Sequence, residues 1–217
     1  MKKNNVSRFV LGFVKITGII PALIFFKPKV ILLNSNCRRI LKKPSILMSN
    51  HNSLLDFVLY LVLFPFSTIR FLMAEVLYNK GKFFSSFLYK LGGIKVDRDA
   101  MDLEFVAQSL EVLDNKGIVG VFPEGRLPVN GVHFPFKSGI SFIASKTDAP
   151  IIPVYTDGNY GLLKRAHVII GEEIYIQDMI DPKKPINEEI SKVTEFLKKE
   201  TYRLKDELEK RLGKRGK

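Results

Sequence analysis

The sequence predicts an α/β domain that follows a basic, apolar N-terminal segment. The chain has 217 residues, 46% of them hydrophobic, which is enough for one well-buried core and few for two equal domains. Its main body alternates short apolar runs with amphipathic ones, as α/β proteins do. The formal charge of +12 is gathered at the N-terminus, where residues 1–50 hold ten Lys or Arg and no acidic residue. We therefore divide the chain into residues 1–42 and 43–217.

Residues 1–42 are predicted to be helical and to attach the chain to a membrane. Spanning a bilayer takes about 20 mostly apolar residues, and the run from Phe9 to Phe26 is shorter and contains Lys15 and Pro21. A helix lying in one leaflet, with its basic residues reaching anionic headgroups, suits this composition better. A signal peptide is one alternative, but no small-residue cleavage pattern follows Phe26. A mitochondrial targeting sequence would be less hydrophobic and richer in Ser and Arg.

The expected strands of the main body are short runs rich in apolar and β-branched residues. They span residues 45–49, 69–74, 93–96, 118–122, 151–155 and 166–170. Amphipathic runs predict helices over residues 54–64, 83–90, 101–114 and 138–146. The C-terminal run from 187 to 213 places apolar residues at three- and four-residue steps. This spacing predicts one long helix with Asn187 as its N-cap and Gly213 as its stop.

The motif NHNSLLD, residues 50–56, places a histidine and an aspartate near a helix start. Residues five apart on an ideal helix lie about 140° apart, so His51 can meet Asp56 only if it precedes the helix. A strand that ends at Ser49 and an N-cap at Ser53 put Asp56 in the first turn. A loop histidine can then fold back to the carboxylate, which would fix its tautomer and make it a general base. The residues alone equally allow a capping box with His51 as an ordinary turn residue.

Two later stretches add charged residues beyond strand ends. LGGIKVDRD, residues 91–99, carries Arg98, which is either an anion contact or a surface arginine paired with a neighbouring aspartate. GVFPEGRLPVNGVHFPFKSG, residues 120–139, runs from a strand into a loop that either presents charges and amides to a polar headgroup or only connects two elements. The loop residues of interest are Glu124, Gly125, Arg126 and Lys137.

Together and in this order, NHNSLLD, GGIKVDR, FPEGR and PIIPV resemble the four motifs of the glycerolipid acyltransferase family, best known for 1-acylglycerol-3-phosphate acyltransferases. The resemblance covers about residues 43–156. It implies a mixed central sheet flanked by helices, with His51 as catalytic base and Asp56 as its orienting carboxylate. It also implies that Arg98 contacts the substrate phosphate and that Glu124 and Gly125 belong to the headgroup-binding loop.

Two positions depart from the family pattern where phosphate contacts are expected. The third motif commonly reads E-G-T-R, whereas here Arg126 directly follows the glycine and Leu127 comes next. Many members also carry a lysine where Glu75 stands. Glu75 would repel a phosphate unless it points away or pairs with a nearby lysine. Because Arg98 and either Arg126 or Lys137 supply two cations, we still expect lysophosphatidic acid as the acceptor.

The resemblance implies transfer of a fatty acyl group from acyl-ACP or acyl-CoA to the 2-hydroxyl of 1-acylglycerol-3-phosphate, giving phosphatidic acid in phospholipid biosynthesis. We expect no bound cofactor and no metal, since His133 and His167 stand alone in sequence. The single cysteine, Cys37, excludes an internal disulfide and favours a reducing compartment, so the protein is expected at the cytoplasmic face of a membrane.

The expected partners are an anionic membrane surface, a lysophospholipid, and acyl carrier protein or coenzyme A as thioester. The alternatives are an acyltransferase for another lysolipid headgroup, a membrane-bound thioesterase or lipid hydrolase, and a non-enzymatic basic membrane-binding protein. A charge of +12 would support binding to any polyanion. The chain shows no recognised nucleic-acid motif with interleaved aromatic residues, so no nucleic-acid partner is expected.

Overall fold

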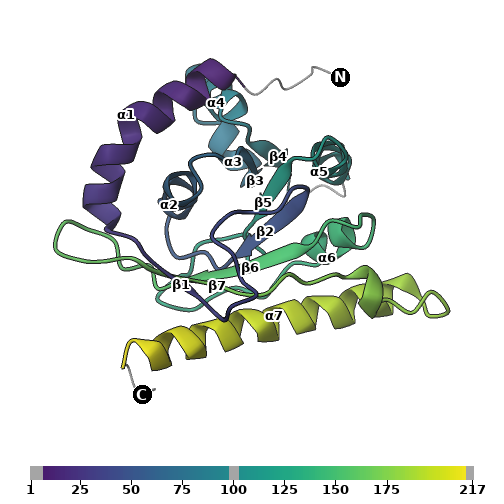
Figure 1. Cartoon of the computed structure of the whole chain (residues 1–217). Helices are drawn as coiled ribbons and strands as arrows, with labels where there is room; N and C mark the ends of the chain where they lie inside the picture. Colours follow the sequence, from purple (N-terminus) through teal and green to yellow (C-terminus); the bar gives the residue numbers. More distant parts are fainter. Residues whose placement is uncertain (1–6, 98–102, 214–217) are drawn as a thin grey trace.

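The computed structural model describes residues 7–97 and 103–213, apart from the side chain of Arg8. Within these ranges seven strands form one sheet with helices on both of its faces (Figure 1). The strands are β1 (Lys29–Leu32), β2 (Ser45–Ser49), β3 (Ile69–Ala74), β4 (Ile94–Val96), β5 (Ile118–Val121), β6 (Ile151–Thr156) and β7 (His167–Ile170). The helices are α1 (Arg8–Phe26), α2 (Asp56–Leu63), α3 (Glu75–Tyr78), α4 (Lys82–Lys90), α5 (Glu104–Asp114), α6 (Gly139–Ala144), η1 (Gln177–Met179, 3₁₀) and α7 (Ile186–Arg211).

The direction of the strands brings three loops together at one end of the sheet, the end where β2, β5 and β6 finish. The strand order is β1-β7-β6-β2-β5-β3-β4, and every neighbouring pair is parallel except β6 with β7. The predicted mixed sheet is therefore confirmed. Because β2, β5 and β6 run the same way, the chain leaves the sheet after Ser49, Val121 and Thr156 at the same end, where open α/β sheets bind ligands.

The central strand β2 is buried on both faces, so its side chains enter two cores. Ile46 and Met48 point into a core completed by α5, α6 and α7. Leu47, between them, points into a second core completed by α1 and α2. This alternation follows from the two-residue period of a strand. All five residues of β2 are buried, which explains why the strand reads as a continuous apolar run.

The N-terminal segment is part of the folded domain and contributes a strand to its sheet. Residues 29–32 form the edge strand β1, which pairs with β7 from Lys29 opposite His167 onwards. The prediction that residues 1–42 are only helices is wrong at this point, because backbone pairing with a distant strand is not visible in local composition. Lys15 also differs from the prediction. Its ammonium group donates to the carbonyls of Pro65 and Ser67 at 2.7 Å, and partial burial lowers its pKa.

All six predicted strands are present, and their ends agree within one residue. The short helix α3 was not predicted, and α2 begins at Asp56, two residues later than expected. Ser53 is not the N-cap of α2, because its hydroxyl accepts from the Leu55 amide within the preceding turn. Asn187 lies inside α7, whose N-cap is Pro185. Residues 101–102 of the predicted helix before Asp114 lie outside the described residues.

Candidate active site

His51 and Asp56 form a hydrogen-bonded pair in the loop between β2 and α2. The ring Nδ1 lies 2.8 Å from Asp56 Oδ2, and the aspartate side chain is fully buried while that of His51 is 15% exposed. The predicted contact is therefore present. It forms because β2 ends at Ser49 and α2 begins only at Asp56, so the intervening loop can fold back over the helix start.

The Asp56 carboxylate accepts hydrogen bonds from four donors. Oδ2 accepts from the backbone amides of Asn52 and Ser53 at 2.7 and 2.9 Å as well as from His51. Oδ1 accepts from the Tyr160 hydroxyl at 2.5 Å. Because the aspartate acts only as an acceptor here, His51 Nδ1 carries the hydrogen and Nε2 keeps its lone pair. No residue in the described ranges hydrogen-bonds Nε2, so this nitrogen is available to a substrate proton.

Tyr160 is a site residue that sequence reasoning missed. It lies in the loop between β6 and β7, 104 residues after Asp56. Burial and the neighbouring Asp56 raise the pKa of its phenol, which keeps the hydroxyl protonated as a donor. The Asp56 carboxylate is therefore bound both by its own loop after β2 and by the loop after β6. No local spacing could have indicated this contact, because it depends on β2 and β6 being neighbours.

Asn50 also escaped prediction, although it stands next to His51. Its side chain is buried and binds the backbone of Thr156 twice, since Nδ2 donates to the carbonyl and Oδ1 accepts from the amide, both at 2.9 Å. Asn52 Nδ2 donates to the same carbonyl at 2.9 Å. These bonds continue the β2–β6 pairing beyond the last strand residue. They fix the loop that carries His51 to the end of β6.

The loop after β5 also contacts His51. The Phe122 ring stacks on the His51 ring, with centroids 4.3 Å apart and planes at 15°. Glu124 is almost fully buried, and its Oε2 lies 2.8 Å from His133 Nδ1. Burial raises the pKa of Glu124, while the His133 ring and the His51 backbone amide lower it in part. The predicted loop therefore does approach the histidine.

The cations of this loop are exposed. Arg126 lies over the Phe134 ring, with its guanidinium carbon 5.8 Å from the ring centroid. Lys137 lies beside Gly125, whose φ of +64° is a backbone conformation suited to glycine; a Cβ there would be 3.7 Å from Lys137 Cγ. Neither cation forms an ion pair with another described residue. Arg98 lies outside the described residues.

Glu75 is neutralised by a neighbour, which removes the main objection to an anionic substrate. Its Oε1 accepts from Lys95 Nζ at 2.7 Å, and this hydrogen bond raises the pKa of the lysine. The sequence left open whether Glu75 would repel a phosphate or pair with a lysine, and the structure shows the pair. Both groups are about one-third exposed, so the pair is a solvated one.

The two remaining histidines, alone in sequence, each have one acidic partner in the structure. His133 pairs with Glu124, and His167 Nδ1 lies 2.8 Å from Asp157 Oδ2. Two-membered pairs do not make a metal site. No group of three or more potential metal ligands occurs among the described residues.

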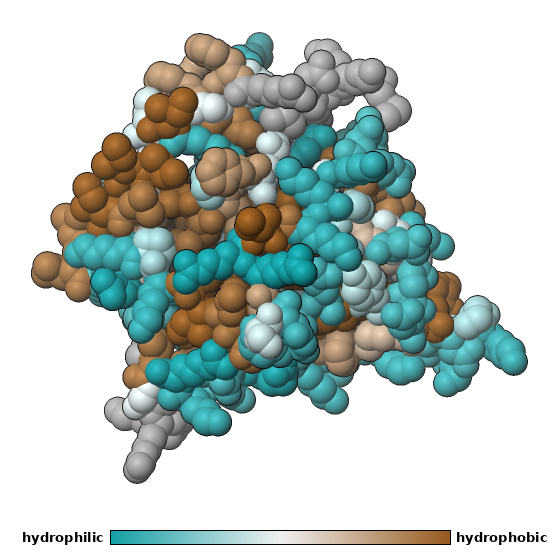
Figure 2. Space-filling view, viewed as in Figure 1, coloured by the Kyte–Doolittle hydropathy of each residue, from teal (hydrophilic) through white to brown (hydrophobic). Residues whose placement is uncertain are grey.

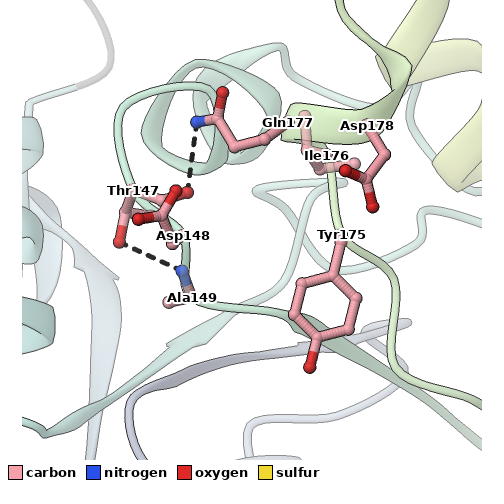
Figure 3. A pocket seen from close by; sticks show the side chains of 7 residues that line it. All are labelled: Thr147, Asp148, Ala149, Tyr175, Ile176, Gln177 and Asp178. Carbon is pink, nitrogen blue, oxygen red and sulfur yellow. Dashed lines mark hydrogen bonds between the residues drawn. The ribbon is translucent and has the colours of Figure 1, made fainter.

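A shallow pocket lies away from this site, near the start of β6 (Figure 3). Gln177 from η1 points across it and donates to the Thr147 carbonyl at 3.2 Å, while the Thr147 hydroxyl accepts from the Ala149 amide at 3.2 Å. The pocket lies at the opposite end of the strands from His51. None of the predicted site residues lines it.

The chain is similar in sequence to several known acyltransferases. The 1-acyl-sn-glycerol-3-phosphate acyltransferase of Bacillus subtilis (strain 168) is 29% identical over 142 residues, which is 63% of this chain and 69% of that protein. Human 1-acyl-sn-glycerol-3-phosphate acyltransferase alpha is 32% identical over 117 residues, covering 52% of this chain and 40% of the human protein. The enzyme of that name from Limnanthes alba is 29% identical, over 55% of this chain and 43% of its own. The chain thus spans about two fifths of the length of the plant and human relatives.

The fold resembles a solved structure along nearly the whole chain. The crystal structure of the 1-acyl-sn-glycerophosphate (LPA) acyltransferase PlsC from Thermotoga maritima superposes with a TM-score of 0.61 at 23% identity, covering 97% of this chain and 81% of that one. At this identity the likeness shows the fold. The family model described as "Acyltransferase" matches residues 29–157, more than half of the chain, including the His51–Asp56 pair and the Glu124 loop. The protein therefore belongs to the Acyltransferase family.

Proposed function

We propose that this protein transfers a fatty acyl group from acyl-ACP or acyl-CoA to the free 2-hydroxyl of 1-acylglycerol-3-phosphate, giving phosphatidic acid. The observation that carries the proposal is the His51–Asp56 pair. Its buried carboxylate orients a ring whose Nε2 has no hydrogen-bond partner among the described residues. Family membership supports acyl transfer, and the names of the relatives support the acceptor.

In the proposed reaction, His51 Nε2 accepts the proton of the acceptor hydroxyl while that oxygen attacks the thioester carbonyl carbon. The tetrahedral intermediate collapses by breaking the carbon–sulfur bond. The leaving thiolate takes the proton back from His51, so an ester and a free thiol are released. Asp56 stabilises the imidazolium between the two proton transfers. General-base assistance of this kind typically contributes about 10²- to 10⁴-fold in rate.

The acceptor's phosphate is proposed to meet the cations around the Glu124 loop. A phosphate monoester carries between one and two negative charges near neutral pH, so it requires cations or amides that converge on it. Arg126 and Lys137 are exposed and come from the loop that also stacks Phe122 on His51. The resemblance adds Arg98. Glu75 is paired to Lys95, and Glu124 of the same loop is buried and bound to His133.

The proposal includes attachment to a membrane leaflet through α1. Its outward face carries an exposed apolar stripe at three- and four-residue steps: Phe9, Phe13, Ile16, Ile20 and Ile24. By length and composition α1 could cross a membrane, since residues Phe9–Phe26 are strongly apolar and mostly not buried within the domain. Both of its ends, however, are tied to the domain. The Ser7 amide donates to the Lys90 carbonyl, and the Ala166 amide donates to the Phe26 carbonyl.

These backbone bonds favour a helix lying in the plane of one leaflet. A helix held along its length against a folded domain cannot cross the bilayer without drawing polar groups of that domain into the hydrocarbon. An in-plane helix can bury its outward stripe while the sheet stays in water. We propose that the domain faces the cytoplasm, where acyl-ACP and acyl-CoA are found.

The decisive test measures thiol release from acyl-CoA and from acyl-ACP with and without 1-acylglycerol-3-phosphate, and identifies products by mass spectrometry. We expect thiol release to require the acceptor and to match the phosphatidic acid formed. Equal release without an acceptor would instead identify a thioesterase. A preference for a lysolipid without a phosphate monoester would refute the acceptor and leave the reaction class intact.

The headgroup assignment is tested by removing single cations. We expect Arg98→Ala, Arg126→Ala and Lys137→Ala each to raise the KM for 1-acylglycerol-3-phosphate about tenfold, the equivalent of one charge-assisted hydrogen bond of roughly 1.5 kcal/mol. Lys146→Ala is the matched control, because Lys146 is an exposed cation over the Phe142 ring at 5.7 Å and directly precedes Thr147, which lines the pocket away from His51. Unchanged KM in all three variants would contradict the assignment.

A further inference from the structure

The loop between β6 and β7 carries two unpacked leucines at its tip. Leu163 is 100% exposed and Leu162 is 63% exposed. Lys164 and Arg165 follow them and are also exposed. The sequence from Gly158 to Ala166 contains no acidic residue. Single exposed apolar residues are common on protein surfaces, but an apolar pair followed by two cations has the composition of a segment that enters an anionic lipid surface.

The loop is held against the C-terminal end of α1. The Ala166 amide donates to the Phe26 carbonyl at 2.8 Å, and the Phe26 and Tyr160 rings meet edge to face at 5.1 Å. The ammonium group of Lys27 donates to the carbonyl of Leu162. The leucines therefore lie at the end of the apolar stripe of α1. Figure 2 shows hydrophobic residues gathered over α1 and, next to them, hydrophilic and further hydrophobic residues where Figure 1 draws this loop.

The loop also begins at the end of the sheet where the candidate site lies. It starts directly after Thr156, whose backbone binds Asn50 beside His51. Tyr160 in the same loop donates to Asp56. A contact between the loop tip and a lipid surface would thus act close to the proposed catalytic pair.

We propose that Leu162 and Leu163 insert into an anionic membrane leaflet as a second attachment point beside α1. Two attachment points at different places orient the molecule, whereas one helix alone leaves it free to roll about the helix axis. The two contacts together turn the end of the sheet that carries His51 towards the lipid surface. This proposal rests on the proposed attachment through α1 and does not depend on the identity of the acceptor.

The test compares binding of the full chain to vesicles of phosphatidylcholine with phosphatidylglycerol and to vesicles of phosphatidylcholine alone. Burying one leucine side chain changes a partition constant at least about tenfold. We therefore expect Leu162→Glu with Leu163→Glu to weaken binding to both kinds of vesicle by at least about a hundredfold, since the two factors multiply. Leu163→Glu alone should retain the fold, because a fully exposed side chain has no packing to lose, and should weaken binding by at least about tenfold.

Ile40→Glu is the matched control. Ile40 is 82% exposed and has Arg38, Arg39, Lys42 and Lys43 close by in sequence, so it too is an exposed apolar residue with basic neighbours. It lies in the connection between β1 and β2, at the opposite end of the strands from the β6–β7 loop. We expect its vesicle binding to match that of the unaltered chain within about twofold.

Replacing the two cations separates charge from apolar insertion. Lys164→Ala with Arg165→Ala should weaken binding to the anionic vesicles by about fivefold per charge. The same variant should bind phosphatidylcholine vesicles as the unaltered chain does. An equal loss on both kinds of vesicle would show that the effect does not come from charge.

The proposal is overturned if Leu163→Glu binds as tightly as the unaltered chain, or if Ile40→Glu loses as much. Phe13→Glu with Ile20→Glu, on the outward face of α1, separates this outcome from a failure of the proposed attachment. Loss of binding in the α1 variant alone would leave α1 as the anchor and reject the loop. Full binding in both variants would reject both.

Discussion

Asp56→Asn isolates the charge of the proposed catalytic pair with little change of shape. Oδ2 takes three of the four hydrogen bonds to the carboxylate, so the amide oxygen of the new side chain is expected to occupy that position. The amide nitrogen then faces the Tyr160 hydroxyl, which can accept from it and donate instead to Thr156 Oγ1, 3.2 Å away. The His51 tautomer is retained, and only the negative charge is lost.

The expected loss of activity is large and the expected loss of stability is modest. Hydrogen bonds to a charged group contribute about 1.5–3 kcal/mol and neutral ones about 0.5–1.5 kcal/mol, so we expect a decrease of roughly 1–3 kcal/mol in the free energy of unfolding. For a chain of this size the Tm should fall by about 2–4 °C per kcal/mol. The imidazolium of His51 loses its partner, so kcat should fall by about 10²- to 10⁴-fold.

Asp157→Asn is the matched control, because Asp157 also pairs with a histidine, His167, at 2.8 Å. The assay is acceptor-dependent thiol release, with a melting curve for each variant. We expect the control to keep activity within about threefold. If Asp56→Asn is folded and turns over within about threefold of the unaltered protein, the catalytic assignment of the pair is wrong. An equal loss in both variants would show a general structural effect.

Three further predictions concern the same site. His51→Ala should abolish acyl transfer while lowering the Tm by only a few degrees, as measured by thiol release and a melting curve, because the ring is partly exposed and lies in a loop. Tyr160→Phe should lower kcat about tenfold, the loss of roughly one hydrogen bond of about 1.4 kcal/mol, without raising the KM for the thioester. Burial raises the pKa of Glu124 above its ordinary value of 4.5, so the folded chain holds this proton more tightly than the unfolded chain. Stability from this group is therefore greatest below pH 4.5 and falls as the pH rises through the folded-state pKa. The Tm of Glu124→Gln relative to that of the unaltered protein should rise between pH 4.5 and about pH 7, and a constant difference would contradict the raised pKa.

The contact between His51 and Asp56 could be predicted because it is local. A strand that ends, a short polar loop and a helix that starts are each readable from a few residues, and together they bring positions 51 and 56 within reach. The strands of the main body were predicted for the same reason, since their apolar runs reflect burial on both faces of the sheet.

The partners that complete the site come from distant parts of the chain. Phe122, Glu124 and Tyr160 reach the loop that carries His51 only because β5 and β6 lie on either side of β2. The pairing of Glu75 with Lys95 likewise depends on β3 and β4 being neighbours. Local periodicity indicates that a strand exists but not which strand lies beside it.

The N-terminal segment shows most clearly what the sequence determined and what the tertiary structure decided. Its apolar and acid-free composition, readable without a structure, predicted apolar helical structure over residues 1–42, and α1 has that character over residues 8–26. Only the fold shows that residues 29–32 continue as an edge strand beside β7 and that Lys15 turns inward to backbone carbonyls. Composition depends on the residues of a segment alone, whereas strand pairing and the direction of a side chain depend on which distant groups can satisfy its hydrogen bonds.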